Sequence, residues 1–174
     1  TMPTIIDGKA LAAKCKNLVK TAVTSMAQKP ILAVIQVGEN PASQVYVRNK
    51  RKDCEECGII SESHMLPADC GQEALLERIK SLNERADVDG ILCQLPLPEG
   101  YDYDEEAILL AIDPGKDVDA FHPINVGHIM IGDPVFLPCT PAGIIRMLDE
   151  YKISVEGKHC VVVGRSNIVG KPMA

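Results

Sequence analysis

The sequence predicts an α/β fold, organised as a three-layer αβα domain around a mostly parallel sheet. Helical and extended patterns alternate three times between residues 7 and 93, which is the order that places helices on both faces of a parallel sheet. The clearest strand candidate, residues 31–37, is an almost continuous apolar run, as expected for a strand covered on both faces. Glycine or proline marks most boundaries between these segments.

Six elements make up this alternation. We expect helices over residues 7–28, 41–57 and 72–86, and strands over residues 31–37, 59–66 and 90–93. Asp7 is a suitable N-cap for the first helix. Asn40 and Pro41 suit the N-cap and first position of the second helix, and Gly58 suits its end.

The second half of the chain is less regular. A short helix is expected over residues 104–112, and an irregular loop that carries carboxylates follows over residues 113–123. Thr140 as N-cap and Pro141 at the first position predict a further helix. Residues 160–163 are rich in valine and predict one more strand.

Composition restricts the class of protein. With 174 residues, 46% of them hydrophobic, the chain is long enough for one full core and part of a second. A net charge of −6 argues against general nucleic-acid binding, and no apolar run is long enough to span a membrane. The first residues do not resemble a signal peptide, so we expect a cytoplasmic protein with small-molecule partners.

The seven cysteines do not follow a disulfide or metal-site spacing. Cys54 and Cys57 form a single C-x-x-C pair late in an expected helix, and a zinc or redox role would need a second pair or a strand-to-helix setting. We therefore expect a reducing compartment and no resident metal.

The candidate site begins at Gln94, which follows the expected strand over residues 90–93. Ligands bind at the carboxyl ends of strands in open α/β sheets. Tyr46 and Lys50 are four residues apart, hence on one face of their helix, and topology allows that face to share a cleft with Gln94. A lysine partly withdrawn from water beside an aromatic ring is a usable general acid or base. The plainer alternatives are that Lys50 is a solvated surface charge and that Asp119 caps a turn.

A second candidate follows the strand expected over residues 160–163. The stretch from Gly164 to Gly170 lies between this strand and an expected helix start, as in the phosphate-binding turn of dinucleotide-binding folds. Ser166 occupies the second glycine position of G-x-G-x-x-G, so an ordinary turn is the competing interpretation. Arg165 and Ser166 offer charge and a hydroxyl to a phosphate.

Taken together, the motifs resemble the bifunctional methylenetetrahydrofolate dehydrogenase/methenyltetrahydrofolate cyclohydrolase family. Five stretches in the same order carry the resemblance: residues 43–50 (SQVYVRNK), 94–98 (QLPLP), 116–119 with 121–123 (KDVD, FHP), 138–141 (PCTP) and 163–170 (VGRSNIVG). The resemblance implies hydride transfer from 5,10-methylenetetrahydrofolate to NADP, and hydrolysis of the methenyl product to 10-formyltetrahydrofolate.

The resemblance also implies the roles of individual residues. Lys50 would be the catalytic lysine, Gln94 would hydrogen-bond to it, Tyr46 would pack over the folate and Asp119 would anchor the pterin amino edge. The implied substrate-binding residues are Tyr46, Lys50, Cys93, Gln94, Leu95 and Asp119. The implied nucleotide contacts are Gly164, Arg165 and Ser166.

Two positions depart from the family pattern, with Ala120 in place of glycine and Cys93 in place of valine.

The resemblance implies a folate-binding catalytic domain over residues 1–138, followed by an incomplete Rossmann-type nucleotide domain over residues 139–174. We therefore expect the chain alone to bind NADP poorly. A homodimer is also implied. A folate-binding or dimerisation module without turnover and a monofunctional family member remain the alternatives.

Overall fold

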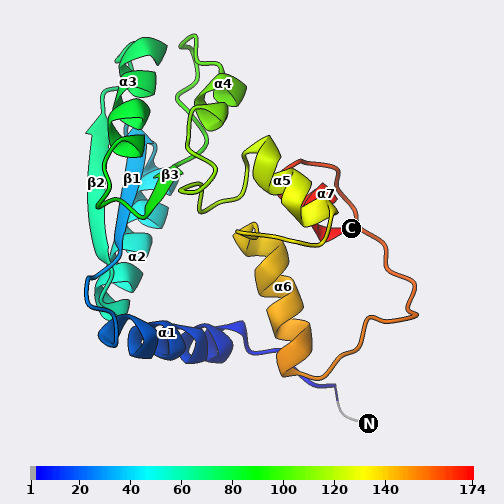
Figure 1. The fold of residues 1–174 in the computed structure, drawn as a ribbon. Coiled ribbons are helices and arrows are strands. Elements are labelled where there is room, and N and C mark those ends of the chain that lie inside the picture. Colours follow the sequence, from blue (N-terminus) through cyan, green and yellow to red (C-terminus); the bar gives the residue numbers. More distant parts are fainter. Residues whose placement is uncertain (1–2) are drawn as a thin grey trace.

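The computed structural model describes residues 3–174, and its centre is a three-stranded parallel sheet (Figure 1). The strands are β1 (Ile31–Val37), β2 (Ile60–Leu66) and β3 (Gly90–Cys93), in the order β2-β1-β3. Ile35 of the central strand pairs with His64 on one side and with Cys93 on the other. The carboxyl end of β3, where Gln94 follows, therefore lies beside the carboxyl end of β1.

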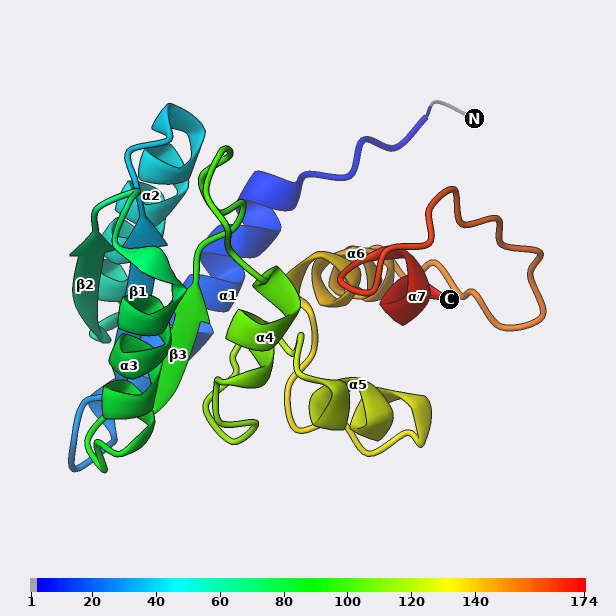
Figure 2. The same cartoon turned by 90° about the horizontal axis from the view of Figure 1, so that it is seen from above.

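Helices cover both faces of this sheet and extend to one side of it (Figure 2). They are α1 (Gly8–Thr24), α2 (Pro41–Cys57), α3 (Gly71–Asn83), α4 (Glu105–Leu110), α5 (Pro123–Met130), α6 (Cys139–Glu150) and α7 (Gly170–Met173). Helix α3 lies on one face with α4 against it, and α2 lies on the other face with α1 packed on its outer side. The predicted three-layer αβα arrangement is confirmed.

The core explains why β1 lacks the polar alternation of a half-exposed strand. Its side chains Ala33, Ile35 and Val37 pack toward α3, and Val34 packs toward Val47 of α2. Both faces of β1 are therefore buried, and each fully buried aliphatic side chain contributes roughly 1.5–3 kcal/mol. This burial makes the sheet a rigid platform for the residues that follow its strands.

Several helix boundaries follow the predicted signals. The Asp7 carboxylate accepts from the Ala10 amide at 2.9 Å, and the Asn40 side chain accepts from the Ser43 amide at 3.3 Å. Gly58 ends α2 with φ +83°, a conformation that favours glycine. The first helix ends at Thr24 rather than residue 28, because the Ser25 hydroxyl and amide both donate to the Ala22 carbonyl.

Two features near the middle of the chain differ from the prediction. Helix α5 was not expected; His122 caps it, its Nδ1 accepting from the Ile124 amide, and Pro123 occupies its first position. Thr140 is not the N-cap of α6, because Pro138 takes that place and the helix starts at Cys139. Proline is still tolerated three residues into α6, because amides of the first turn have no intrahelical acceptor.

The strand predicted over residues 160–163 is absent. The segment between α6 and α7 is irregular and extends away from the other elements (Figure 1), and Val163 is 98% exposed. A strand needs a hydrogen-bonded neighbour, and residues 160–163 have none within the part of the chain that the structure describes. Valine content alone therefore did not produce a strand here.

Candidate functional site

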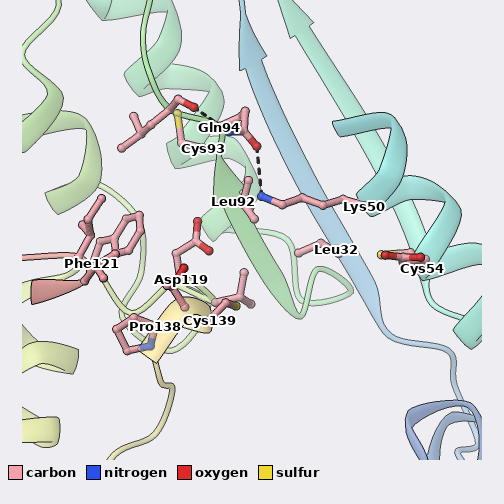
Figure 3. Close-up of a pocket in the computed structure, with 16 residues that line it drawn as sticks. Leu32, Lys50, Cys54, Leu92, Cys93, Gln94, Asp119, Phe121, Pro138 and Cys139 are labelled. Atoms are coloured by element: carbon pink, nitrogen blue, oxygen red, sulfur yellow. Dashed lines mark hydrogen bonds between the residues drawn. The ribbon is translucent and has the colours of Figure 1, made fainter. Parts of the chain in front are cut away.

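A cavity of about 500 Å³ lies at the carboxyl end of β3, where the site is predicted (Figure 3). Its walls come from α2, the end of β3, the loop over residues 118–121, the start of α6 and residues 168–169. This volume is in the range of small-molecule sites, and the location is where ligands bind in open α/β sheets.

Lys50 and Gln94 meet inside this cavity. The Lys50 ammonium donates to Gln94 Oε1 at 3.1 Å, and Gln94 Nε2 donates to the Leu95 carbonyl at 2.7 Å (Figure 3). The Gln94 backbone amide donates to the Ile35 carbonyl at 2.9 Å, so the sheet fixes the residue itself. The amide of Gln94 is thereby oriented with its oxygen toward the lysine. The prediction that these two residues share a cleft is confirmed.

Asp119 points into the same space from the wall opposite Lys50 (Figure 3). Burial raises the pKa of this carboxyl, the positive charge of Lys50 acts in the opposite direction, and the neighbouring Asp117 raises it further. The cavity thus places an amine, an amide and a carboxylate around one small volume.

Three thiols, those of Cys54, Cys93 and Cys139, also line the cavity without adding charge. Burial raises the pKa of Cys93 to about 12, and it also raises the pKa of Cys54 and of Cys139. All three side chains are therefore neutral near pH 7. Asp53, farther along α2, is paired with Lys16 at 3.1 Å. Lys50 and Asp119 are thus the two opposite charges that face each other across the cavity.

The structure places most of the predicted substrate-binding residues in this cavity. Lys50, Cys93, Gln94, Leu95 and Asp119 all line it. Tyr46 does not: it lies one turn before Lys50 with its side chain 62% exposed.

Other lining residues were missed by the prediction. Asp53 and Cys54 follow Lys50 by three and four residues, a helical spacing that could have revealed them. Phe121, Cys139 and Thr140 also line the cavity, although the sequence pattern predicted no binding role for them and indicated only an N-cap role for Thr140.

The predicted nucleotide contacts Gly164, Arg165 and Ser166 do not line the main cavity, although Ile168 and Val169 of the same loop do. Ser166 lines a second cavity of about 360 Å³ that shares Phe121 and Ile168 with the first. The Ser166 hydroxyl oxygen accepts from the Val169 and Gly170 amides, both at 3.2 Å. Its own proton remains available to a phosphate oxygen.

The loop is also tightly closed. A side chain at Gly170 would bring its Cβ to 2.6 Å from both the Arg165 nitrogen and the Gly164 carbonyl carbon, so glycine is required there. Gly164 itself has φ +155°. Arg165, the second residue of this loop, is exposed. A compact glycine turn with an adjacent arginine and a free hydroxyl proton fits the phosphate-bearing part of a nucleotide.

Within residues 3–174, no group of three or more His, Cys, Asp or Glu side chains is arranged to hold a metal ion. Nor does that part of the chain contain a helix with the length and apolar character needed to cross a bilayer.

Comparison with protein families gives two matches along the chain. The model of the tetrahydrofolate dehydrogenase/cyclohydrolase catalytic domain matches residues 6–119, and the model of the NAD(P)-binding domain of the same enzymes matches residues 138–174. The first match includes Lys50, Gln94 and Asp119, and the second includes the loop from Gly164 to Gly170.

Individual relatives agree with these matches. The bifunctional protein FolD of Desulfovibrio desulfuricans is 56% identical over 98% of the chain, which spans 60% of that relative's length. The crystal structure of the bifunctional FolD dehydrogenase/cyclohydrolase from Campylobacter jejuni is 50% identical, with a TM-score of 0.93, covering 98% of this chain and 61% of that one. A third relative is the crystal structure of a Trypanosoma brucei dehydrogenase-cyclohydrolase complexed with NADP cofactor and inhibitor, which is 37% identical with a TM-score of 0.92. The match covers 99% of this chain and 61% of the Trypanosoma chain. The chain belongs to the tetrahydrofolate dehydrogenase/cyclohydrolase family.

Proposed function

We propose that the protein takes part in one-carbon metabolism as an NADP-dependent methylenetetrahydrofolate dehydrogenase and methenyltetrahydrofolate cyclohydrolase. The observation that carries the proposal is the Lys50–Gln94 pair facing Asp119 across a single cavity. The bifunctional relatives support the same activity for this chain, which spans about three fifths of their length.

The hydrolytic step suits the groups in the cavity. Water adds to the electrophilic carbon that bridges two nitrogens in 5,10-methenyltetrahydrofolate, and one carbon–nitrogen bond then breaks to leave the 10-formyl product. Once the Lys50 ammonium has given up a proton to solvent, its amine takes a proton from the attacking water and returns one to the ring nitrogen that leaves. Gln94 holds the amine in place through its side-chain oxygen. The step consumes no nucleotide.

Asp119 is proposed to bind the pterin ring. Its carboxylate can accept two hydrogen bonds from the amino edge of that ring, a charge-assisted contact that also fixes orientation. Cys93 and Leu95 supply the adjoining wall. Tyr46, exposed at 62% and one helical turn from Lys50, is proposed to stack on the folate where it leaves the cavity.

The dehydrogenase reaction needs NADP, which when bound accepts a hydride from the methylene bridge of the folate. Gly164, Arg165 and Ser166 are proposed to hold its phosphates. We accordingly propose a division into a folate-binding catalytic part over residues 1–138 and a nucleotide-binding part over residues 139–174. The irregular segment before Gly164 supports the expectation that the chain alone binds NADP poorly. Tight NADP binding in a titration would contradict that expectation.

Three further properties are proposed together. The net charge of −6 supports small-molecule partners rather than nucleic acid, and nothing in the proposed chemistry needs a membrane. Seven free cysteines support a cytoplasmic location. A homodimer is consistent with exposed apolar side chains at Met130, Ile131 and Val135, and light scattering would measure it directly.

The test of the function is a direct assay of 5,10-methenyltetrahydrofolate hydrolysis without nucleotide, corrected for the uncatalysed reaction. We expect hydrolysis well above that background. Binding of tetrahydrofolate without hydrolysis would favour a module that lacks turnover, and hydrolysis without any NADP-dependent oxidation would favour a monofunctional enzyme. A protein that neither binds tetrahydrofolate nor hydrolyses 5,10-methenyltetrahydrofolate would overturn the proposal.

A further inference from the structure

We propose that Asp117 and Asn125 are positioning residues that hold the loop bearing Asp119 in its binding conformation. The inference rests on the proposed function, in which Asp119 binds the pterin. Neither residue lines the cavity, so any effect on ligand binding must pass through Asp119.

The two side chains form a buried polar cluster behind the loop. Asp117 and Asn125 are each 2% exposed. Asp117 Oδ2 accepts from the His122 amide at 2.8 Å and from Asn125 Nδ2 at 3.0 Å. Asn125 Nδ2 also donates to the Pro114 carbonyl at 3.0 Å. One carboxylate oxygen therefore joins the end of the loop to the first turns of α5.

The backbone closes the same loop from its other end. Asp117 lies beside Ile91 of β3, whose amide donates to the Lys116 carbonyl at 2.7 Å. The Ala120 amide donates to the Asp117 carbonyl at 3.1 Å, and Ala120 has φ +56°. This conformation is unfavourable for a residue with a Cβ, so the turn requires the surrounding contacts to persist. Asp119 sits inside this turn, between the two anchored positions.

Asp117 also acts on Asp119 through its charge. The groups that face the Asp119 carboxyl are Lys50 from α2, Cys93 at the end of β3, Cys139 from α6 and Asp117 from the loop itself. The two thiols are neutral near pH 7. The negative charge of Asp117 raises the pKa of Asp119, whereas Lys50 lowers it. Position and charge are therefore two separable effects of one residue.

Two substitutions separate these effects. Asn125→Ala removes the anchor and keeps the charge of Asp117, whereas Asp117→Asn removes the charge and keeps an oxygen that can accept both hydrogen bonds. Asp113→Asn is the matched control, because Asp113 also accepts a backbone amide, that of Gly115 at 2.7 Å, but among the described residues its carboxylate makes no hydrogen bond to the turn that carries Asp119. The probe is tetrahydrofolate, which carries the pterin but no one-carbon bridge to react, measured by calorimetric titration between pH 4 and pH 8.

We expect Asn125→Ala to weaken tetrahydrofolate binding about tenfold at pH 7, because a misplaced binding group loses much of its contribution. The conservative Asn125→Ser, which keeps a hydrogen-bond donor, should recover part of this loss. Asp117→Asn should move the acidic limit of binding to lower pH, since Asp119 then loses its proton more readily. Asp113→Asn should change neither quantity.

The outcomes distinguish this inference from the function on which it rests. A wild-type protein that binds no tetrahydrofolate would overturn the proposed function and the inference with it. Wild-type binding together with unchanged affinity in Asn125→Ala would overturn the inference alone. If Asn125→Ala does not give a cooperative thermal melt, Asn125→Ser decides: weakened tetrahydrofolate binding supports the inference, and unchanged affinity overturns it.

Discussion

Replacement of Lys50 by methionine is the most informative single change at the site. Methionine keeps much of the apolar stem that lies along the cavity wall but removes the ammonium and its 3.1 Å hydrogen bond to Gln94. The cavity retains its shape, and Asp119 still faces it. Binding of the pterin should therefore survive, while the proton transfers of hydrolysis lose their acid and base.

The size of the effect follows from the role proposed for the amine. A positioned general acid or base contributes about 10²–10⁴-fold to a rate. That range corresponds to about 2.7–5.4 kcal/mol of transition-state stabilisation. We expect kcat for hydrolysis of 5,10-methenyltetrahydrofolate to fall by this factor, with a much smaller change in KM because Lys50 acts mainly on the reacting atoms.

The assay compares initial hydrolysis rates of wild type, Lys50→Met and a matched control, Lys52→Met. Lys52 is on the same helix and exposed, and it does not line the cavity, so its replacement should leave kcat unchanged. Thermal melts of all three proteins exclude unfolding as a cause. Turnover by Lys50→Met within twofold of wild type would remove Lys50 from the mechanism.

The remaining predictions concern the neighbours of Lys50. Gln94→Ala should lower kcat about tenfold, since one hydrogen bond to a charged group is worth roughly 1.5–3 kcal/mol and water replaces part of it; an unchanged kcat would contradict its proposed role. Asp119→Asn should abolish tetrahydrofolate binding in a calorimetric titration yet raise the melting temperature at pH 7, because the raised pKa of Asp119 means that folding opposes its ionisation. The gain in melting temperature should shrink as pH falls through the pKa of Asp119, because wild-type Asp119 is itself neutral at lower pH. A gain that increases as pH falls would contradict the claim that folding raises this pKa. Cys93, buried with a pKa of about 12, should resist a thiol reagent at pH 8 while the exposed Cys160 reacts at once, as mass spectrometry of partly labelled protein would report.

The parts of the fold that sequence predicted well are those with local signals. Asn40 before Pro41 marks the start of α2, and Gly58 marks its end, because capping and left-handed geometry depend on the residues at those positions themselves. The apolar run of β1 similarly reports burial on both faces. These elements in turn predicted that Lys50 and Gln94 could share a cleft.

The parts that failed depend on partners that the pattern does not contain. Residues 160–163 have a strand-like composition, but a strand forms only against a neighbour, and none lies beside them in the described residues. Helix α5 begins at a local capping pattern, with His122 as N-cap and Pro123 at the first position. The prediction placed both residues in the loop over residues 113–123 and therefore missed the helix.

The residues of the site also divide into those that the sequence motifs indicate and those that only tertiary contacts reveal. Lys50, Gln94 and Asp119 came from motif resemblance, whereas Asp117 and Asn125 are visible only as contacts across the folded loop. Phe121 and Cys139 reach the cavity because the loop over residues 118–121 and the start of α6 form two of its walls, a tertiary relation that no spacing encodes.

The most direct test of the central claim is a crystal structure of the protein with tetrahydrofolate bound. Our account places the pterin amino edge within hydrogen-bond distance of the Asp119 carboxylate, with the nitrogens that carry the one-carbon unit beside Lys50. A ligand bound elsewhere, with Lys50 and Asp119 still facing each other across an empty cavity, would contradict it.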